Sequence, residues 1–251
     1  MLKKERQRLI IEKISKKKKL LASELSAEFN CSEDTIRRDL RELDQKGMLK
    51  RVHSGAISLG PAVTSFDQRI SLNTNQKEKL AQEAISHLHE DSIILLDGST
   101  TNYFVAKKLP EYFSATIITN SPYISIELLK KKNITVINLG GVLAKRQAVS
   151  LGIETVQSLD SLRIDTYVMG VYNFHPEIGL SMHSQEESLV KQKMVEISDE
   201  LIALATKDKL DVYSNYIYCE PSKIDLLITD STDRDALKKF QSKNIIVKSL
   251  D

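Results

Sequence analysis

Arginine side chains in one short segment carry the clearest chemistry in this chain. The segment reads SEDTIRRDLRELDQKG from Ser32, and at about 100° per residue Arg38 and Arg41 fall on one side of a helix, with Arg37 at the flank. An arginine guanidinium can donate two hydrogen bonds to the edge of a guanine, and Asp34, four residues before Arg38, is placed to orient that group. The pattern therefore predicts a helix that faces a polyanion and reads DNA bases.

The same helix needs a packed face and defined ends. Ile36, Leu40 and Leu43 form an apolar stripe opposite the arginines. Ser32 is a good N-cap and Gly47 stands where a helix would stop, so the sequence predicts a helix over residues 33–46.

The preceding residues predict two further helices that would position this one. Ser23 is placed to cap a short helix that ends at Phe29, and residues 30–31 suit a tight turn. An earlier helix over residues 4–15 offers isoleucines to a shared core. Helix, turn and helix is the simplest interpretation.

A basic wing should follow the helices. Residues 49–57 alternate like two strands with a turn at residues 53–55. A three-helix bundle with a solvated basic face is the alternative, but the helix-turn-helix spacing together with the wing favours a DNA-binding winged helix.

Positive charge is concentrated at the start of the chain. Residues 1–60 contain 15 Lys and Arg against 9 Asp and Glu, whereas residues 61–251 contain 21 against 25. A local positive excess is what a DNA-binding module requires. The lysine run at residues 16–19 contributes to it, either as a phosphate contact or simply as a solvated turn.

Length and composition limit the class of protein. With 251 residues and 41% hydrophobic content, the chain can form one small domain and a larger one with its own core. We find no apolar run near the roughly 20 residues needed to span a bilayer and no secretory signal, so we expect a cytoplasmic protein without membrane contact. Cys31 and Cys219 are too few for a disulfide framework or a zinc site, and we expect no metal and no cofactor.

The remainder of the chain predicts an α/β domain. Residues 58–74 have little periodicity and suit a linker, and a helix is expected over residues 76–89. Apolar runs of strand length then alternate with helical stretches, which is typical of a mostly parallel, doubly covered sheet. The expected strands are residues 92–96, 116–118, 134–138, 166–169, 201–205, 225–228 and 244–247.

Small polar residues and glycines follow the first three of these strands. They are Asp97, Gly98, Ser99, Thr100 and Thr101 after the first, Asn120 and Ser121 after the second, and Gly140 and Gly141 after the third. Such loops at helix N-termini offer backbone N–H groups to an anion, and ligands bind at the carboxyl ends of parallel strands. Each loop also has an ordinary structural explanation, since Ser121 before Pro122 is a plain N-cap and Gly140 with Gly141 suits a tight turn. Together they favour a phosphate site.

The run from Leu25 through SEDTIRRDLRELDQKGMLKRVHSGA resembles the DNA-binding domain of DeoR-type bacterial transcription regulators. Ser54 departs from that pattern, because the family usually has a second glycine in the wing. The resemblance assigns the recognition helix and the wing, and we expect DNA contacts from Ser32, Asp34, Thr35, Arg37, Arg38, Arg41, Arg51 and His53.

The second domain resembles the DeoR-type sensor domain through FDQRI, LLDGSTT, ITNS, NLGG, GLSMHSQEESLVKQKM and ATKDKL. That domain is Rossmann-like and similar in fold to ribose-5-phosphate isomerase and coenzyme A transferases, and in the family it senses phosphorylated sugars. The resemblance implies an effector site formed by Asp97, Gly98, Ser99, Thr100 and Thr101 as the phosphate loop, with Asn120, Gly140, Gly141, Glu187, Lys191 and Lys209 around the remainder of the ligand.

Simpler interpretations compete for some of these residues. Glu187 and Lys191 could be a surface ion pair at i and i+4, and Lys209 a solvated lysine. Two positions depart from the family pattern, since Asn173 replaces a glycine and Thr206 an aspartate, so the identity of the ligand does not transfer.

The leading hypothesis is a DNA-binding repressor of a sugar operon whose DNA affinity responds to a sugar phosphate. It implies double-stranded operator DNA as partner and a homodimer or homotetramer, because two DNA half-sites need two DNA-binding domains. The alternative is a sugar-phosphate isomerase-like enzyme with Asp97, Glu187 and Lys209 as proton-transfer groups. A third hypothesis is a regulator that has lost its ligand. Because an isomerase would not need the N-terminal domain, we expect no enzyme activity and no catalytic residue.

Overall fold

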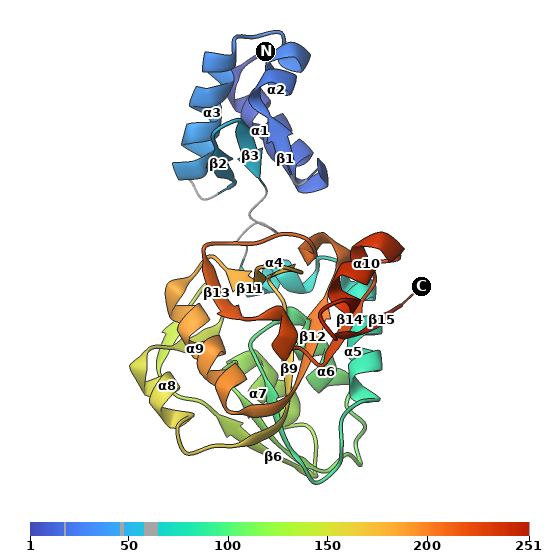
Figure 1. The fold of residues 1–251 in the computed structure, drawn as a ribbon. Coiled ribbons are helices and arrows are strands. Elements are labelled where there is room, and N and C mark those ends of the chain that lie inside the picture. The colour runs from blue at the N-terminus through green and yellow to red at the C-terminus, as the bar shows by residue number, and fades with distance from the viewer. Residues whose placement is uncertain (18, 46–47, 58–64, 251) are drawn as a thin grey trace. The chain divides into compact units, whose positions relative to one another are not determined.

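The computed structural model describes residues 1–17, 19–45, 48–57 and 65–250, and the chain divides into two compact units, Met1–Val63 and Thr64–Asp251 (Figure 1). The predicted helix end at Lys46 and Gly47 lies outside the described residues, as do Lys18 of the lysine run and residues 58–64 of the expected linker.

The first unit is a winged helix-turn-helix. It contains α1 (Lys3–Lys17), β1 (Lys19–Leu21), α2 (Ala22–Phe29), α3 (Glu33–Gln45), β2 (Lys50–Val52) and β3 (Gly55–Ile57). The three strands form an antiparallel sheet in the order β1-β3-β2. Ile36, Leu40 and Leu43 are buried with Ile10 and Ile14, which confirms the predicted stripe and its partners.

Two details of this unit differ from the sequence prediction. The predicted cap at Ser23 is wrong, because α2 begins at Ala22 with Leu21 at the N-cap position and no side-chain cap. Leu21 still pairs with Gly55 in the sheet, and the Ala22 N–H donates to the Ser54 carbonyl at 2.9 Å, so strand β1 runs directly into the helix. Asn30, with φ of 48°, ends α2 in the left-handed conformation, as the predicted turn requires.

The second unit is built on a parallel sheet of seven strands in the order β15-β14-β12-β9-β4-β5-β6. These strands are β4 (Ile93–Leu96), β5 (Ala115–Thr119), β6 (Ile134–Asn138), β9 (Ile164–Gly170), β12 (Ser198–Ala205), β14 (Leu226–Thr229) and β15 (Ile246–Ser249). Each overlaps one of the seven predicted strands, and the predicted α/β class is confirmed.

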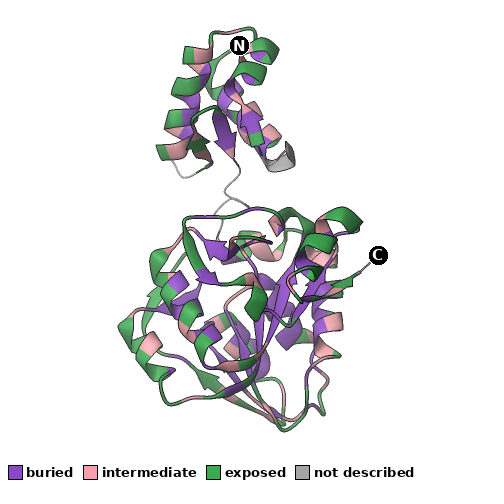
Figure 2. Cartoon of the chain, viewed as in Figure 1, coloured by how far each residue is buried: buried purple, intermediate pink, exposed green. Residues whose placement is uncertain are grey.

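Helices cover both faces of this sheet, and the strands between them are largely buried (Figure 2). Leu80, Phe104 and Leu128 pack on the face that carries Ile94, whereas Val190, Met194 and Phe240 pack on the face that carries Leu95. The helices are α5 (Thr74–Ile85), α6 (Thr100–Lys108), α7 (Pro122–Leu128), α8 (Ile153–Ser158), α9 (Gln185–Glu196) and α10 (Arg234–Gln241).

Several elements of this unit were not predicted. A hairpin of β7 (Val142–Ala144) and β8 (Val149–Leu151) follows β6, and β10 (Asn173–His175), β11 (Gly179–Met182) and β13 (Tyr216–Cys219) form a small antiparallel sheet. The expected linker over residues 58–74 is also too long, because Phe66–Ile70 form helix α4 with a complete capping box at Ser65.

Candidate functional site

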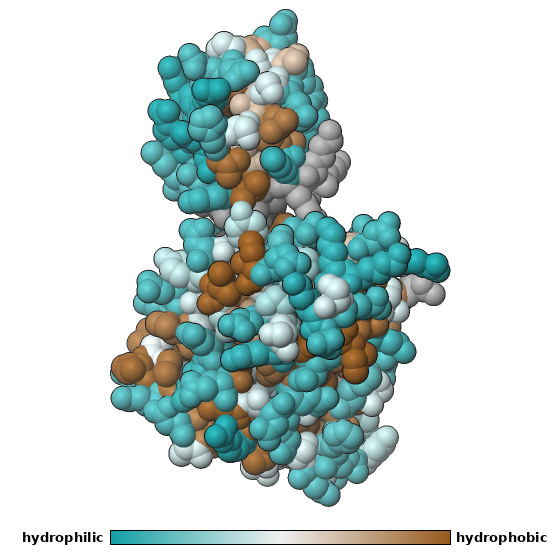
Figure 3. Space-filling view, in the orientation of Figure 1, coloured by the Kyte–Doolittle hydropathy of each residue, from teal (hydrophilic) through white to brown (hydrophobic). Residues whose placement is uncertain are grey.

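The residues predicted to contact DNA lie on α3, just before it and in the wing. On α3 the charged ones are on the side away from the buried stripe, whereas Ser32 precedes the helix and Arg51 and His53 belong to the wing. Hydrophilic residues cover much of the side of the first unit seen in Figure 3. Ser32, Asp34, Arg37, Arg38, Arg41, Arg51 and His53 are exposed and Thr35 is half-buried.

The charges on this face are not paired as expected. We expected Asp34 to orient Arg38, but the ion pair recorded on this face joins Glu33 to Arg37 at 2.9 Å. Within the described part of the chain, Arg38 and Arg41 have no side-chain partner, so both guanidinium groups are available to a ligand. At the start of the helix, the predicted cap is confirmed because the Ser32 hydroxyl accepts the Thr35 N–H at 3.3 Å.

Asp39 positions α3, and the sequence reasoning missed it. Its carboxylate is buried and accepts a hydrogen bond from Arg6 Nε of α1 at 2.5 Å and one from Gln7 Nε2 at 3.2 Å. The hydrogen bond to Asp39 raises the pKa of Arg6. In the run Arg37-Arg38-Asp39, the two arginines face outward while the aspartate fixes the helix to its support.

The wing is attached to the same helix. The Arg51 N–H donates to Asp44 Oδ1 at the end of α3 at 3.2 Å. Ser54 does not have a left-handed backbone, so the turn does not need the family's second glycine here. Gly55 is required instead, because a Cβ there would lie 1.9 Å from the Leu20 carbonyl oxygen.

The second set of predicted residues lies at the carboxyl end of the parallel sheet. The chain builds outward from β4 to β5 and β6 on one side, and from β9 to β12, β14 and β15 on the other. This reversal of strand order between β4 and β9 is where open α/β sheets bind ligands. Asp97 follows β4 directly, and Gly170 is the last residue of β9.

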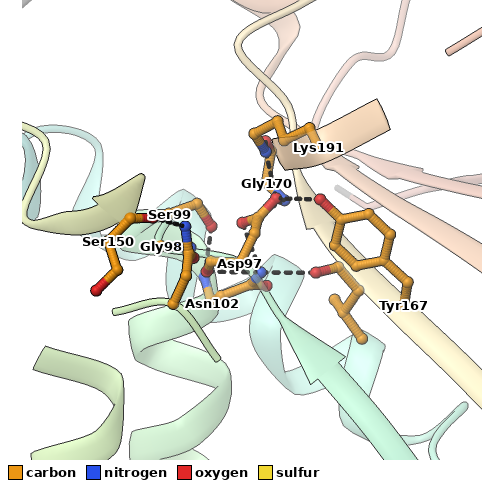
Figure 4. A network of polar contacts seen from close by, with 10 residues as sticks. Asp97, Gly98, Ser99, Asn102, Ser150, Tyr167, Gly170 and Lys191 are labelled. Atoms are coloured by element: carbon orange, nitrogen blue, oxygen red, sulfur yellow. Dashed lines mark hydrogen bonds and ion pairs between the residues drawn. The ribbon is translucent and has the colours of Figure 1, made fainter. Parts of the chain in front are cut away.

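Asp97 is the centre of a buried network (Figure 4). Its carboxylate accepts hydrogen bonds from Asn102 Nδ2 at 2.9 Å, from Tyr167 Oη at 2.9 Å and from the Gly170 N–H at 3.0 Å, and it forms an ion pair with Lys191. Burial raises the pKa of Tyr167 well above its ordinary value, so this phenol stays a donor. These contacts fix the conformation of the loop that follows Asp97.

The loop after Asp97 carries backbone donors that suit an anion. Asn120 Oδ1 accepts the Gly98 N–H at 3.1 Å, which joins the loop to the end of β5. Ser99 caps α6 by accepting the Asn102 N–H at 3.0 Å. The backbone N–H groups of Thr100 and Thr101, in the first turn of α6, have no acceptor among the described residues, and the helix dipole favours negative charge there.

Gly140 and Gly141 do not join this loop. The Gly140 carbonyl accepts a hydrogen bond from Thr155 Oγ1 at 2.6 Å, and Gly141 has φ of +124° at the turn into β7. Both residues are exposed. Their geometry matches the tight-turn alternative.

On α9, Lys191 is not half of a surface ion pair with Glu187. Lys191 is buried, and its ammonium group contacts Asp97 and the Gly170 carbonyl. Burial raises the pKa of Glu187, against the opposing charges of Lys191 and Arg69.

A cluster of three cations, Arg69, Lys77 and Lys209, lies at the same end of the sheet. Burial and the charges of Lys209 and Arg69 lower the pKa of Lys77 to about 8. Burial also lowers the pKa of Lys209, and the charges of Arg69 and Lys191 act in the same direction. The carboxylate of Asp208 opposes both shifts. Cations gathered in this way are candidates for binding an anion. The sequence reasoning found Lys209 but missed Arg69 and Lys77, because it treated residues 58–74 as linker and gave the next helix no site role.

Some buried polar atoms near these charged residues have no hydrogen-bond partner among the residues that the structure describes. In the described part of the second unit they include Arg69 Nε, His183 Nδ1 and the Tyr218 hydroxyl. Orphaned buried donors of this kind are rare unless a ligand or water satisfies them.

The two departures from the family pattern are both structural. Asn173 is buried and donates to Ser214 Oγ at 2.8 Å, and Thr206 is buried at the start of the short 3-10 helix Lys207–Lys209.

The fold and the two sites define a winged-helix transcription regulator with an α/β sensor domain. Residues 6–61 match the family model of the DeoR-like helix-turn-helix domain, and residues 72–231 match that of the DeoR C terminal sensor domain. The chain belongs to the DeoR family of transcriptional regulators.

Relatives of similar length support this assignment. The chain is 35% identical to the HTH-type transcriptional regulator GolR of Listeria innocua, over 97% of both chains. It is 31% identical to the HTH-type transcriptional repressor GlcR of Bacillus subtilis, over 97% of this chain and 95% of that one.

Solved structures similar to the chain include eIF2B beta from Chaetomium thermophilum, with 16% identity, a TM-score of 0.48 and coverage of 68% of this chain and 54% of that one. They also include ribose 5-phosphate isomerase A from Methanocaldococcus jannaschii, with 16% identity, a TM-score of 0.40 and 55% coverage of both. No helix within the described ranges is long and apolar enough to cross a membrane.

Proposed function

We propose that this regulator is a repressor of a sugar operon and that a phosphorylated sugar, bound at the carboxyl end of the sheet, lowers its affinity for operator DNA. The observation that carries the proposal is the pairing of free N–H groups at Thr100 and Thr101 with the cation cluster at the strand-order reversal. The relative GlcR is named as a repressor, which supports the direction of control.

Arg38 and Arg41 would read base edges, while Arg37, Arg51 and His53 would contact the backbone or the minor groove beside the wing. Reading two half-sites requires two copies, so we propose a homodimer or a homotetramer. The effector would act by linkage, with a coupling free energy of about 1–3 kcal/mol between the two sites.

A thermal-shift screen of the full chain against sugars and their phosphate esters tests the effector class. A ligand at 100 times its Kd stabilises by about 2.7 kcal/mol, which a melting experiment resolves. We expect stabilisation by one sugar phosphate and none by its parent sugar. That compound should then release the chain from a duplex selected from random sequences, and equal shifts with sugar and ester would contradict a phosphate-based site.

The isomerase alternative is not favoured by the site. Asp97 is engaged by Asn102, Tyr167, Gly170 and Lys191, which leaves its carboxylate unavailable as a base. Turnover of ribose 5-phosphate that disappears in Glu187→Ala would overturn this conclusion.

A further inference from the structure

Helix α4, which has the sequence FDQRI, lies between the residues that the two family models match. The first model ends at residue 61 and the second begins at residue 72, whereas α4 spans Phe66–Ile70. Only seven residues separate Ile57, the end of β3, from Ser65, which caps α4. Helix α4 is therefore the first described element of the second unit that the chain reaches from the DNA-binding unit.

Arg69 on α4 has more donors than the protein uses. Its Nη2 donates to the Gln147 carbonyl at 3.3 Å, and its guanidinium lies over the Phe66 ring, 5.7 Å from the centroid. Its Nε is buried and has no acceptor among the described residues. An unsatisfied buried donor destabilises the fold, and more so on a charged group, so this Nε is a candidate for bonding to a bound ligand.

The charges around Arg69 show what kind of partner fits. Glu187 acts on Arg69 electrostatically and is its main anionic neighbour, while burial lowers the pKa of the guanidinium. The charge of Arg69 in turn lowers the pKa of Lys77 and of Lys209. Asp208 also acts on Lys77 and Lys209, and Asp97 acts on Arg69 and Lys209 but is already paired with Lys191. Two further carboxylates, Glu187 and Asp208, therefore face three cations, and a guanidinium matches the oxygens of a phosphate ester.

We propose that Arg69 donates hydrogen bonds to the phosphate of the effector, and that α4 thereby couples occupancy of this site to the segment leading to the DNA-binding unit. The inference rests on the proposed function, since it assumes a phosphorylated ligand at the carboxyl end of the sheet.

The attachments of α4 support a coupling role. The Phe66 N–H donates to the Arg146 carbonyl at 3.0 Å in the turn between β7 and β8, and the Phe66 ring packs on Tyr103 of α6 and Tyr123 of α7. Lys77 of α5 donates to the Arg69 carbonyl. A helix of five residues thus rests on the elements that begin at the site, and a ligand held by Arg69 and by the start of α6 would fix α4 against them.

Hydrogen exchange of the full chain, with and without inorganic phosphate as the probe, tests the proposal. We expect phosphate to slow exchange in the peptide containing α4 as well as in the peptide containing Thr100 and Thr101. In Arg69→Gln, phosphate should bind about tenfold more weakly and α4 should lose its response. Arg69→Lys keeps the charge but lacks Nε, and should recover only part of the affinity. Lys79→Gln, which removes an exposed charge from α5, is the matched control and should bind like the wild type.

The outcomes separate the inference from the proposed function. If phosphate protects the start of α6 but leaves α4 unchanged, and Arg69→Gln and Arg69→Lys both bind normally, the coupling role is wrong while the phosphate site stands. If phosphate protects neither peptide in the wild-type chain, the phosphate site and the role of Arg69 fail together. Circular dichroism of both variants establishes that they are folded.

Discussion

The DNA-binding face and the site at the carboxyl end of the sheet are both built from charged residues, but in opposite ways. On α3, Arg38 and Arg41 are exposed and unpartnered within the described residues, and local helical periodicity places them. At the sheet, Asp97 and Lys191 are buried and held by partners on several elements. Substitutions on the first surface should therefore change affinity with little effect on folding, whereas substitutions in the second should change folding itself.

The largest effect should come from Asp97→Ala. It leaves Lys191, Tyr167 and the Gly170 N–H buried without their acceptor, and breaking a buried ion pair in this way costs about 3–5 kcal/mol. All eight tyrosines follow residue 100 and the chain has no tryptophan, so tyrosine fluorescence during urea unfolding reports on the second unit alone. Tyr167→Phe removes one hydrogen bond and should cost only about 1 kcal/mol. Equal costs would show that the ion pair contributes nothing.

Asp39→Ala tests whether a buried charge also supports the exposed face. Loss of the Arg6 and Gln7 hydrogen bonds should destabilise the first unit by about 2 kcal/mol, since hydrogen bonds to a charged group are worth about 1.5–3 kcal/mol. Hydrogen exchange in α1 and α3 measures this directly. DNA binding should fall on all sequences alike, because the whole helix loses its support. A loss confined to one base position would contradict this and make Asp39 a base contact.

Arg38→Ala should lower specific DNA affinity by about 1–3 kcal/mol, relax the preference at one base position and leave the melting temperature unchanged. Fluorescence anisotropy on the selected duplex and on single-base variants measures both effects. Arg8→Ala is a matched control, because it removes an exposed charge on α1. An equal loss on specific and random DNA would show that Arg38 contacts phosphate only.

The same contrast explains what could be predicted from the sequence. The stripe of α3 and the seven strands follow from local periodicity and apolar runs, and both were found. The partners of Asp97 could not be found this way, because Tyr167, Gly170 and Lys191 lie 70, 73 and 94 residues away in the chain. The five residues of α4 are too few for a helical period, and the strands of the small sheet are three or four residues long.

Asp97 and Arg69 also show the limits of residue type as a guide. The sequence places Asp97 at the start of an expected phosphate loop, but its orientation depends on a lysine from α9 that only the fold brings near. Arg69 stands in a polar stretch that suits a linker, and its role depends on charges from α5, α9 and the short helix at Lys209. Long-range packing, not composition, determines both assignments.

The smallest predicted effect is a pH dependence of phosphate binding at the sheet that DNA binding on α3 does not share. Burial and nearby cations lower the pKa of Lys77 to about 8, so this ammonium is charged below that pH and neutral above it. A bound phosphate dianion raises that pKa again, so affinity for the probe phosphate should fall as pH rises through 8. If only the protonated form of Lys77 binds, its charged fraction drops about tenfold between pH 7 and 9, and the apparent Kd for the phosphate dianion, corrected for the fraction of the probe that is dianionic at each pH, rises by about the same factor. Titration calorimetry at the two pH values measures this change in Kd.

Lys77→Arg should flatten this pH profile, and DNA binding through arginines, which stay protonated, should not follow it. A wild-type profile that is already flat would place the phosphate away from Lys77 and confine the anion to the start of α6.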